Sequence, residues 1–210
     1  FSGGVEIEAG RLIGDSESIP GNAELSSGTS LIFLQTAAGT HTGNISGAGK
    51  LVKSGSGTLT LAGTSTYTGD TAIRKGSLRG DTRSLVGNIT LTSSVLEDDP
   101  NCVEENQFVC IEFAFPDDQT FDDTVSGTGN FVKSGTGSLT LAAGALIAHT
   151  GTTEVTGGTL RLATDLLETS NVTVDAGAAL ENASANGQVT INGGLVSRGR
   201  VNLGGVTSEL

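Results

Sequence analysis

One block of sixteen residues occurs twice in this chain, and it constrains the fold more than any other feature. The first copy, residues 46–61, reads SGAGKLVKSGSGTLTL, and the second, residues 126–141, reads SGTGNFVKSGTGSLTL. Eleven of the sixteen positions are identical at a constant offset of 80 residues. Self-similarity at a fixed offset is the signature of a fold built from stacked, repeated units. We therefore expect internal units at residues 1–45 (partial), 46–125 and 126–210.

Short segments in which apolar and polar residues alternate indicate strands between the turns. Alternation with period two places Val, Ile and Leu on one face of a strand and polar residues on the other. The clearest examples are VEIE at 5–8, TLTL at 58–61, NITL at 88–91 and NVTV at 171–174. No convincing helix is predicted, since residues 165–170 could form at most one turn.

Glycines punctuate these strands at regular places, and glycine accepts a positive φ without steric cost. We expect corners at Ala9–Gly10, Lys75–Gly76, Gly157–Gly158 and Ala176–Gly177. The strands start again after roughly 16 to 26 residues, a step that fits one coil of a β-solenoid. An antiparallel sandwich would use the same strands, but it has no reason to carry an 80-residue repeat. The predicted fold is all-β, a parallel β-helix (β-solenoid) of about ten rungs with one acidic loop insertion.

The repeated block and the segment after it resemble the passenger-associated repeat of Gram-negative autotransporters. The pattern GxGxLxKxGxGTLTLxG, followed by YTGxTxIxxGxL, is matched by residues 47–63 and 67–78, and again by residues 127–141 and 151–160. The second copy departs from it at Ala143 and His149. The resemblance implies a right-handed parallel β-helix, exported across the outer membrane to the cell surface or the extracellular space by a C-terminal barrel. We expect this barrel and any targeting signal to lie outside these 210 residues, which make up one β-helical segment of a larger passenger.

Composition narrows the classes of partner. The formal net charge of −12 disfavours nucleic-acid binding. No apolar run of about 18 residues is present, so no membrane span is predicted.

An acidic insertion at about residues 97–123 breaks the repeat pattern. It holds ten of the 23 carboxylates, and no Lys or Arg lies between Arg83 and Lys133. We expect its central part to leave the coil as a solvated loop. Three candidate recognition residues, Phe108, Phe113 and Phe115, also lie in this segment, so a recognition surface is a further interpretation. The alternative is that these phenyl groups fill an enlarged rung of the coil.

The two cysteines, Cys102 and Cys110, lie in this insertion, and a closely spaced pair in an exported protein favours a disulfide. A zinc site is disfavoured because the only histidines, His41 and His149, are remote in sequence. A Ca²⁺ site remains an alternative to the solvated loop, because carboxylates suit hard cations. Its candidate ligands are Asp98, Asp99, Asp117, Asp118, Asp122 and Asp123.

Two short motifs resemble functional sites of other proteins, one catalytic and one for binding. Gly14–Asp15–Ser16 resembles the nucleophile block of an esterase family, but it aligns with residues 80–82 of the next unit, which indicates a recurring turn. The remaining candidate recognition residues, Arg79, Gly80 and Asp81, form a tripeptide that many integrin ligands share, and a plain solvated corner is the alternative interpretation.

The residues of the repeat itself are interpreted as structural. Lys53 and Lys133 are predicted to face outward between apolar neighbours. His149 aligns with Tyr67, so we interpret it as a packing position and not as a base or ligand.

The sequence thus predicts a non-enzymatic passenger segment with no catalytic residue, metal ligand or cofactor. The expected partners are a host-cell receptor or matrix, or the same protein on other cells. The alternative is a spacer or stalk in a toxin or in an esterase-type passenger.

Overall fold

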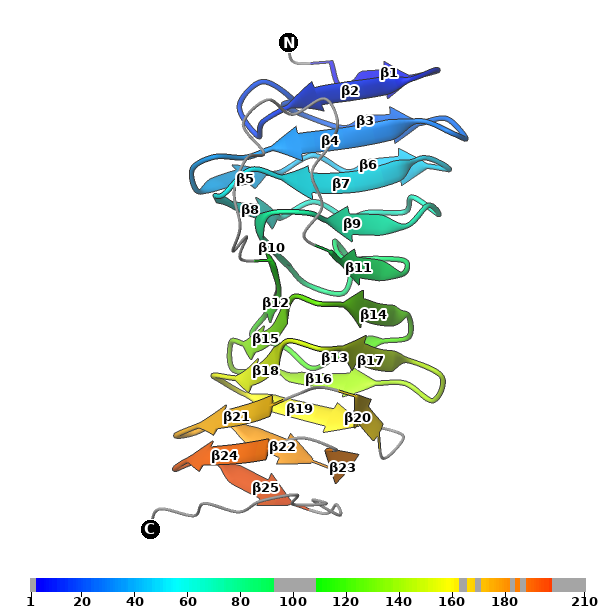
Figure 1. Ribbon diagram of the computed structural model, residues 1–210. Coiled ribbons are helices and arrows are strands. Elements are labelled where there is room, and N and C mark those ends of the chain that lie inside the picture. The colour runs from blue at the N-terminus through cyan, green and yellow to red at the C-terminus, as the bar shows by residue number, and fades with distance from the viewer. Residues whose placement is uncertain are drawn as a thin grey trace. The chain divides into compact units, whose positions relative to one another are not determined.

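The structure is a computed structural model that describes residues 3–92, 109–162, 166–168, 171–181, 184–185 and 188–197 (Figure 1). The chain divides into two compact units, Phe1–Ile111 and Glu112–Leu210. The described part of each unit consists of short strands joined by turns, and no helix occurs among the described residues.

In the first unit the strands form three parallel ladders. Consecutive members of a ladder are about one coil apart along the chain; for example, Gly39 pairs with Leu59. The first ladder contains β1 (Val5–Ile7), β3 (Ala23–Leu25) and β6 (Ile45–Gly47). The second contains β2 (Arg11–Gly14), β4 (Ser30–Leu34), β7 (Lys50–Ser54), β9 (Thr71–Ile73) and β11 (Ile89–Leu91). The third contains β5 (Gly39–His41), β8 (Thr58–Leu61) and β10 (Gly76–Gly80).

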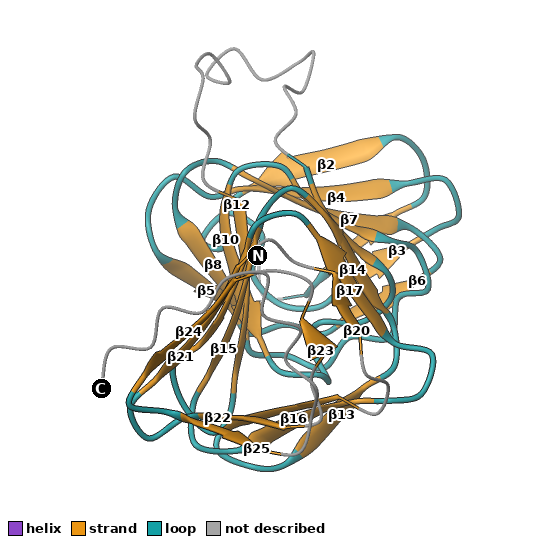
Figure 2. Ribbon diagram, turned by 60° about the horizontal axis from the view of Figure 1, so that its bottom comes forward, coloured by secondary structure: helices purple, strands orange, loops and turns teal. Residues whose placement is uncertain are grey.

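The second unit repeats this arrangement, and Figure 2 shows its ladders as three walls around a common interior. One wall contains β14 (Thr124–Gly127), β17 (Leu146–His149), β20 (Leu166–Glu168) and β23 (Ser184–Ala185). Another contains β12 (Val109–Ala114), β15 (Asn130–Ser134), β18 (Thr152–Val155), β21 (Asn171–Asp175) and β24 (Gln188–Asn192); β12 begins in the first unit. The last contains β13 (Gln119–Phe121), β16 (Ser138–Leu141), β19 (Thr159–Leu162), β22 (Ala179–Glu181) and β25 (Leu195–Ser197).

The predicted β-solenoid is therefore confirmed, and the antiparallel sandwich is excluded. The described strands make about eight turns, which is fewer than the ten predicted. The ten rungs were predicted for all 210 residues, whereas part of the chain lies outside the described residues. Segment 165–170 contains the strand β20 where the sequence allowed one helical turn.

The core of each unit is an apolar column inside the walls, made by the inward position of each strand. In the first unit Leu31, Leu51 and Ile89 lie on one row of the second ladder and are fully buried. In the second unit Leu139, Leu160 and Leu180 form an equivalent row. Each such leucine contributes about 1.5–3 kcal/mol when it is removed from water. Stacking therefore stabilises the short strands, which would not hold their conformation alone.

Glycine corners join the strands as the sequence predicts. Gly10, Gly76, Gly158 and Gly177 all have a positive φ, between 63° and 82°. The four strand segments used as examples above are also strands in the structure. The alternation of apolar and polar residues and the glycines were thus sufficient to predict these strands and corners.

Part of the predicted acidic insertion belongs to the solenoid. Strands β12 and β13 both lie inside residues 97–123. The reason is that Val109, Ile111 and Phe113 alternate with period two and turn inward. Residues 97–108 lie outside the described part of the chain.

Candidate functional site

Asp81 holds the turn after β10 together, and it is part of the predicted Arg79–Gly80–Asp81 motif. Its Oδ1 accepts hydrogen bonds from the backbone N–H groups of Arg83 and Ser84, both at 3.0 Å. Its Oδ2 accepts from Nε of Arg83 at 2.9 Å and from Nη2 at 2.7 Å. Partial burial raises the pKa of Asp81, but the hydrogen bonds and charge of Arg83 outweigh this, so the pKa lies below its usual value. The carboxylate is thus engaged within its own turn, whereas Arg79 is exposed.

The same turn occurs one repeat earlier at Asp15. Its Oδ1 accepts from the backbone N–H groups of Glu17 at 3.1 Å and Ser18 at 2.8 Å, and from the Ser18 hydroxyl at 2.6 Å. The interpretation of Gly14–Asp15–Ser16 as a recurring turn is confirmed, because Asp15 and Asp81 bind equivalent groups. The motif therefore provides a capping carboxylate.

Two of the three phenylalanines predicted as recognition residues lie in the core. Phe113 is fully buried, with its ring centroid 5.1 Å from that of Phe121 and 5.5 Å from that of Phe131. Phe115 is 4% exposed and lies under the ammonium group of Lys133 at 4.8 Å. Both rings fill the interior, so the structure agrees with the filled-rung interpretation for these two positions and contradicts the recognition surface there. Phe108 lies outside the described residues.

The predicted disulfide is not supported. Cys110 is buried near the start of β12, and its Sγ lies 3.5 Å from the backbone oxygen of Ile111. Cys102 lies outside the described residues, and no disulfide occurs among the residues that the structure describes. The Cys102–Cys110 bond therefore stays a prediction.

The described acidic residues of the insertion do not gather into a cation site. Within the described ranges, no group of three or more His, Cys, Asp or Glu side chains is placed to hold a metal ion. Asp118 instead accepts the backbone N–H of Ser138 at 2.8 Å, and this hydrogen bond lowers its pKa. Asp98 and Asp99 lie outside the described residues, so the Ca²⁺ alternative is untested for them.

Lys53 and Lys133 face the interior, and the prediction that they point outward is wrong. Both side chains are 0% exposed. Nζ of Lys53 donates to the backbone oxygens of Ser54 at 2.8 Å, Gly55 at 2.7 Å and Lys75 at 3.0 Å. A signal for this was present in the sequence, because Lys53 lies two residues after the buried Leu51 and so shares its face.

Nζ of Lys133 makes the same three contacts in the second unit. It donates to the backbone oxygens of Ser134, Gly135 (3.3 Å) and Gly157 (3.2 Å). Burial lowers the pKa of Lys53 to about 7. It lowers the pKa of Lys133 to about 8, where the charge of Asp118 acts in the opposite direction.

Both histidines are packing residues, as predicted for His149. Nδ1 of His149 lies 2.8 Å from the backbone oxygen of Gly129, and its ring stacks on Phe131. His41 is 1% exposed and contacts Phe33, with ring centroids 5.0 Å apart. Burial lowers the pKa of both rings, so each is neutral near pH 7.

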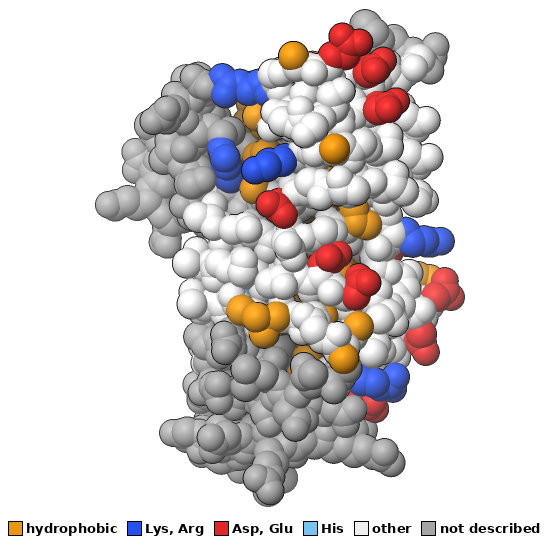
Figure 3. Space-filling model, turned by 90° about the vertical axis from the view of Figure 1, so that its right-hand side faces the viewer, with side chains coloured by type: hydrophobic (Ala, Val, Ile, Leu, Met, Phe, Trp, Pro, Cys, Tyr) orange, Lys and Arg blue, Asp and Glu red, His pale blue; other side chains and the backbone are white. Residues whose placement is uncertain are grey.

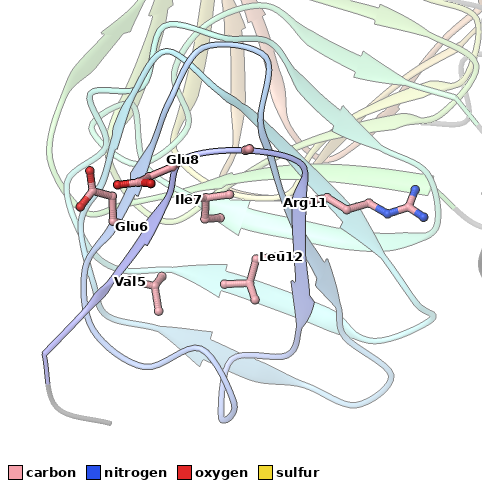
Figure 4. A pocket seen from close by; sticks show the side chains of 7 residues that line it. Val5, Glu6, Ile7, Glu8, Arg11 and Leu12 are labelled. Carbon is pink, nitrogen blue, oxygen red and sulfur yellow. The ribbon is translucent and has the colours of Figure 1, made fainter.

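A pocket of about 630 Å³ lies at the first described turn (Figure 4). Val5, Ile7 and Leu12 point into the interior of this turn, while Glu6 and Glu8 point away on one side and Arg11 on the other (Figure 4). The residues that point inward are all apolar, so the pocket belongs to the apolar interior of the coil.

The outward positions of the strands form rows of polar side chains. In the second unit one row runs through Thr120, Thr140, Arg161 and Glu181, and Nε of Arg161 lies 2.8 Å from Oε2 of Glu181. In the first unit Thr40, Thr60 and Arg79 form another row. In the view of Figure 3, charged side chains are scattered over a surface of mostly uncharged groups. Among the described residues, the one large apolar side chain classed as exposed is Ile13.

These features define a repeat protein of the stacked-turn class, in which each repeat carries one buried lysine at a corner. The sequence profile of the passenger-associated-transport-repeat family matches residues 51–79 and 131–162, which contain these two corners. The chain belongs with the autotransporter passengers that carry this repeat, so the resemblance noted in the sequence is confirmed.

A curated relative is described as "Adhesin BmaC autotransporter" from Brucella suis biovar 1 (strain 1330). It is 30% identical over 199 residues, which cover 82% of this chain and 6% of that protein. This chain therefore spans a small part of the relative's length. No solved structure matches the chain. No helix in the described part is long and apolar enough to cross a membrane.

Proposed function

We propose that this chain is a non-enzymatic segment of a surface-exposed or secreted autotransporter passenger, and that it acts in adhesion to host cells or matrix or in aggregation of sister cells. The observation that carries the proposal is the 30% identity to a protein described as an adhesin, over most of this chain. The geometry agrees with this role, because the described turns present rows of polar side chains along their outer faces.

Binding through such rows differs from binding in a cleft. Each outward Thr, Asn or Ser offers a modest hydrogen bond, and stacking repeats that group about every 4.8 Å. Many weak contacts along one face give useful affinity through multivalency. The capping role of Asp81 weakens the case for the Arg79–Gly80–Asp81 tripeptide as the main contact, since its carboxylate is bound to Arg83.

The test uses cells that display the chain on their surface. One variant combines Thr120→Arg and Thr140→Arg, which changes an outward row without entering the core. A second variant, Asp81→Ala, removes the capping carboxylate. The control for the double variant is Glu24→Gln, which changes an exposed residue on a different row. We expect the double variant to lower attachment or aggregation at least several-fold, with wild-type surface levels and the control unchanged.

The second candidate is a passive spacer of a toxin or an esterase-type passenger. It is favoured if no surface variant, including deletion of residues 97–108, changes attachment or aggregation. The esterase version would need its catalytic serine elsewhere, because Gly14–Asp15–Ser16 is a structural turn in which the Asp15 carboxylate binds Ser18 and the backbone N–H of Ser16 donates to Gln35.

A further inference from the structure

Both copies of the repeated block, residues 46–61 and 126–141, place a lysine in a cage of three backbone carbonyl oxygens. In the first unit the three oxygens belong to Ser54, Gly55 and Lys75, and all lie within 3.0 Å of one nitrogen atom, Nζ of Lys53. An ammonium group has three donors and no acceptor, so three carbonyls satisfy it completely. The carbonyls are satisfied in turn, although they point into the interior.

No carboxylate oxygen is among these acceptors, although the charge of Asp118 acts on Lys133. Each ammonium group instead donates to three backbone oxygens, those of Ser54, Gly55 and Lys75 for Lys53 and those of Ser134, Gly135 and Gly157 for Lys133. A buried cation normally pairs with an anion. Here neutral carbonyl oxygens replace the anion, as they do in sites that bind monovalent cations.

The backbone that builds the cage is fixed by close packing. Gly55 has a φ of 76°, and a Cβ there would lie 2.5 Å from the backbone oxygen of Gln35. Gly135 has a φ of 75°, and a Cβ there would lie 2.4 Å from the backbone oxygen of Phe115. The carbonyl positions therefore do not depend on the lysine side chain alone, which means that the cage can persist when that side chain is shortened.

We propose that the cages around Lys53 and Lys133 are monovalent-cation sites that the lysine ammonium groups fill, and that each filled site fastens one turn to the next. The chemical class of its ligand is a primary alkylammonium ion. The third oxygen comes from the following turn, from Lys75 for Lys53 and from Gly157 for Lys133. The site is thus complete only when the next turn has folded against the first. It therefore couples the stability of neighbouring turns.

The test is chemical rescue of Lys53→Ala at pH 6, below the pKa of about 7 of Lys53. This change removes the three outer carbons and the nitrogen, which n-propylammonium supplies again. We expect the midpoint of thermal unfolding to fall by about 6–12 °C. Added n-propylammonium chloride should then restore at least half of the loss, with saturation.

Three controls separate a cation site from a simple cavity. n-Propanol has the same chain without the charge, tetramethylammonium has the charge without N–H donors, and sodium chloride matches the ionic strength. Lys50→Ala is the matched variant, because Lys50 is an exposed lysine on the same strand. Equal rescue by n-propanol, or no rescue specific to the primary ammonium ion, would overturn the proposal.

A second measurement uses the unmodified 210-residue chain, in case Lys53→Ala does not fold. With ¹⁵N-labelled lysine, the Nζ protons of Lys53 and Lys133 should exchange slowly with water and give observable signals at pH 6, unlike those of the exposed Lys50. Assignment relies on Lys53→Met and Lys133→Met, each of which should remove one signal. Rapid exchange at both buried lysines would refute a closed cage.

Discussion

The hydroxyl oxygen of Tyr67 lies 2.6 Å from Oγ1 of Thr71 inside the first unit. In the second repeat His149 takes the place of Tyr67, and its Nε2 lies 2.9 Å from Oγ1 of Thr153. The departure from the repeat pattern at His149 thus keeps the hydrogen bond to threonine while it changes the ring. Both rings are buried, so the bond is made away from water.

This relationship predicts that the two residues can be exchanged. Tyr67→His should cost less than about 1 kcal/mol in unfolding free energy, because a donor or acceptor remains for Thr71. Tyr67→Phe should cost about 1 kcal/mol, because the hydrogen bond to Thr71 is lost. His149→Tyr and His149→Phe also remove the contact of Nδ1 with the Gly129 oxygen, so His149→Tyr should cost about 1 kcal/mol and His149→Phe about 2 kcal/mol. Urea unfolding followed by circular dichroism measures all four. Phenylalanine variants as stable as the wild type would show that the bond is not needed.

Ser54 and Ser134 occupy the same repeat position in different surroundings. The Ser134 hydroxyl donates to Oε1 of Glu112 at 2.6 Å, whereas Leu34 is the ladder neighbour of Ser54. Oγ of Ser54 is buried without a hydrogen-bond partner. Ser134→Ala should therefore destabilise the chain by about 1–3 kcal/mol, and Ser54→Ala should be neutral or stabilising. The same sign for both changes in a urea titration would contradict this interpretation of the two sites.

The buried lysines predict a specific dependence of stability on pH. The folded pKa of Lys53 is about 7 against an ordinary value of 10.5, so the unfolded chain binds more protons between these values. Stability should therefore rise as the pH increases from about 7 to 10.5, because the neutral amine still donates N–H groups to the cage while the cost of burying the charge is removed. Lys133, with a pKa of about 8, adds to the rise over the upper part of this range.

The measurement compares unfolding midpoints in urea at several pH values between 6 and 10. Lys53→Met should remove the part of the rise that begins near pH 7, and Lys50→Met should leave it intact. A wild-type curve that is flat or falls over this range would show that the carbonyl oxygens hold the ammonium charge more strongly than burial disfavours it.

Alanine substitutions at two glycines with a positive φ distinguish the cost of backbone strain from the cost of a steric clash. Gly10 has a φ of 71°, and a Cβ added there would have no atom within 4 Å, whereas a Cβ at Gly55 would lie 2.5 Å from a backbone oxygen. Gly10→Ala should cost about 1–2 kcal/mol for the left-handed conformation alone. Gly55→Ala should cost about 3 kcal/mol or more, since the carbonyl of Gln35 must also move. Equal losses in thermal unfolding would mean that this corner can relax.

The sequence by itself determined the repeat, the strands and the corners. The 80-residue offset, the period-two alternation and the glycines act locally, so they identified β8 and the corner at Gly76 without knowledge of the coil. The alignment of Asp15 with Asp81 also identified a recurring turn, because both side chains bind groups two and three residues ahead.

Only the tertiary structure decided which way the special residues face. The sequence predicted that Lys53 and Lys133 face the solvent, because a charged side chain is rarely buried without an anion. For Phe113 the sequence left two interpretations, a recognition surface and the filling of an enlarged rung. Their burial depends on carbonyls and rings from neighbouring turns about twenty residues away, such as Lys75 and Phe131. Such contacts form only when one turn stacks on another, so a pattern within one turn does not contain them.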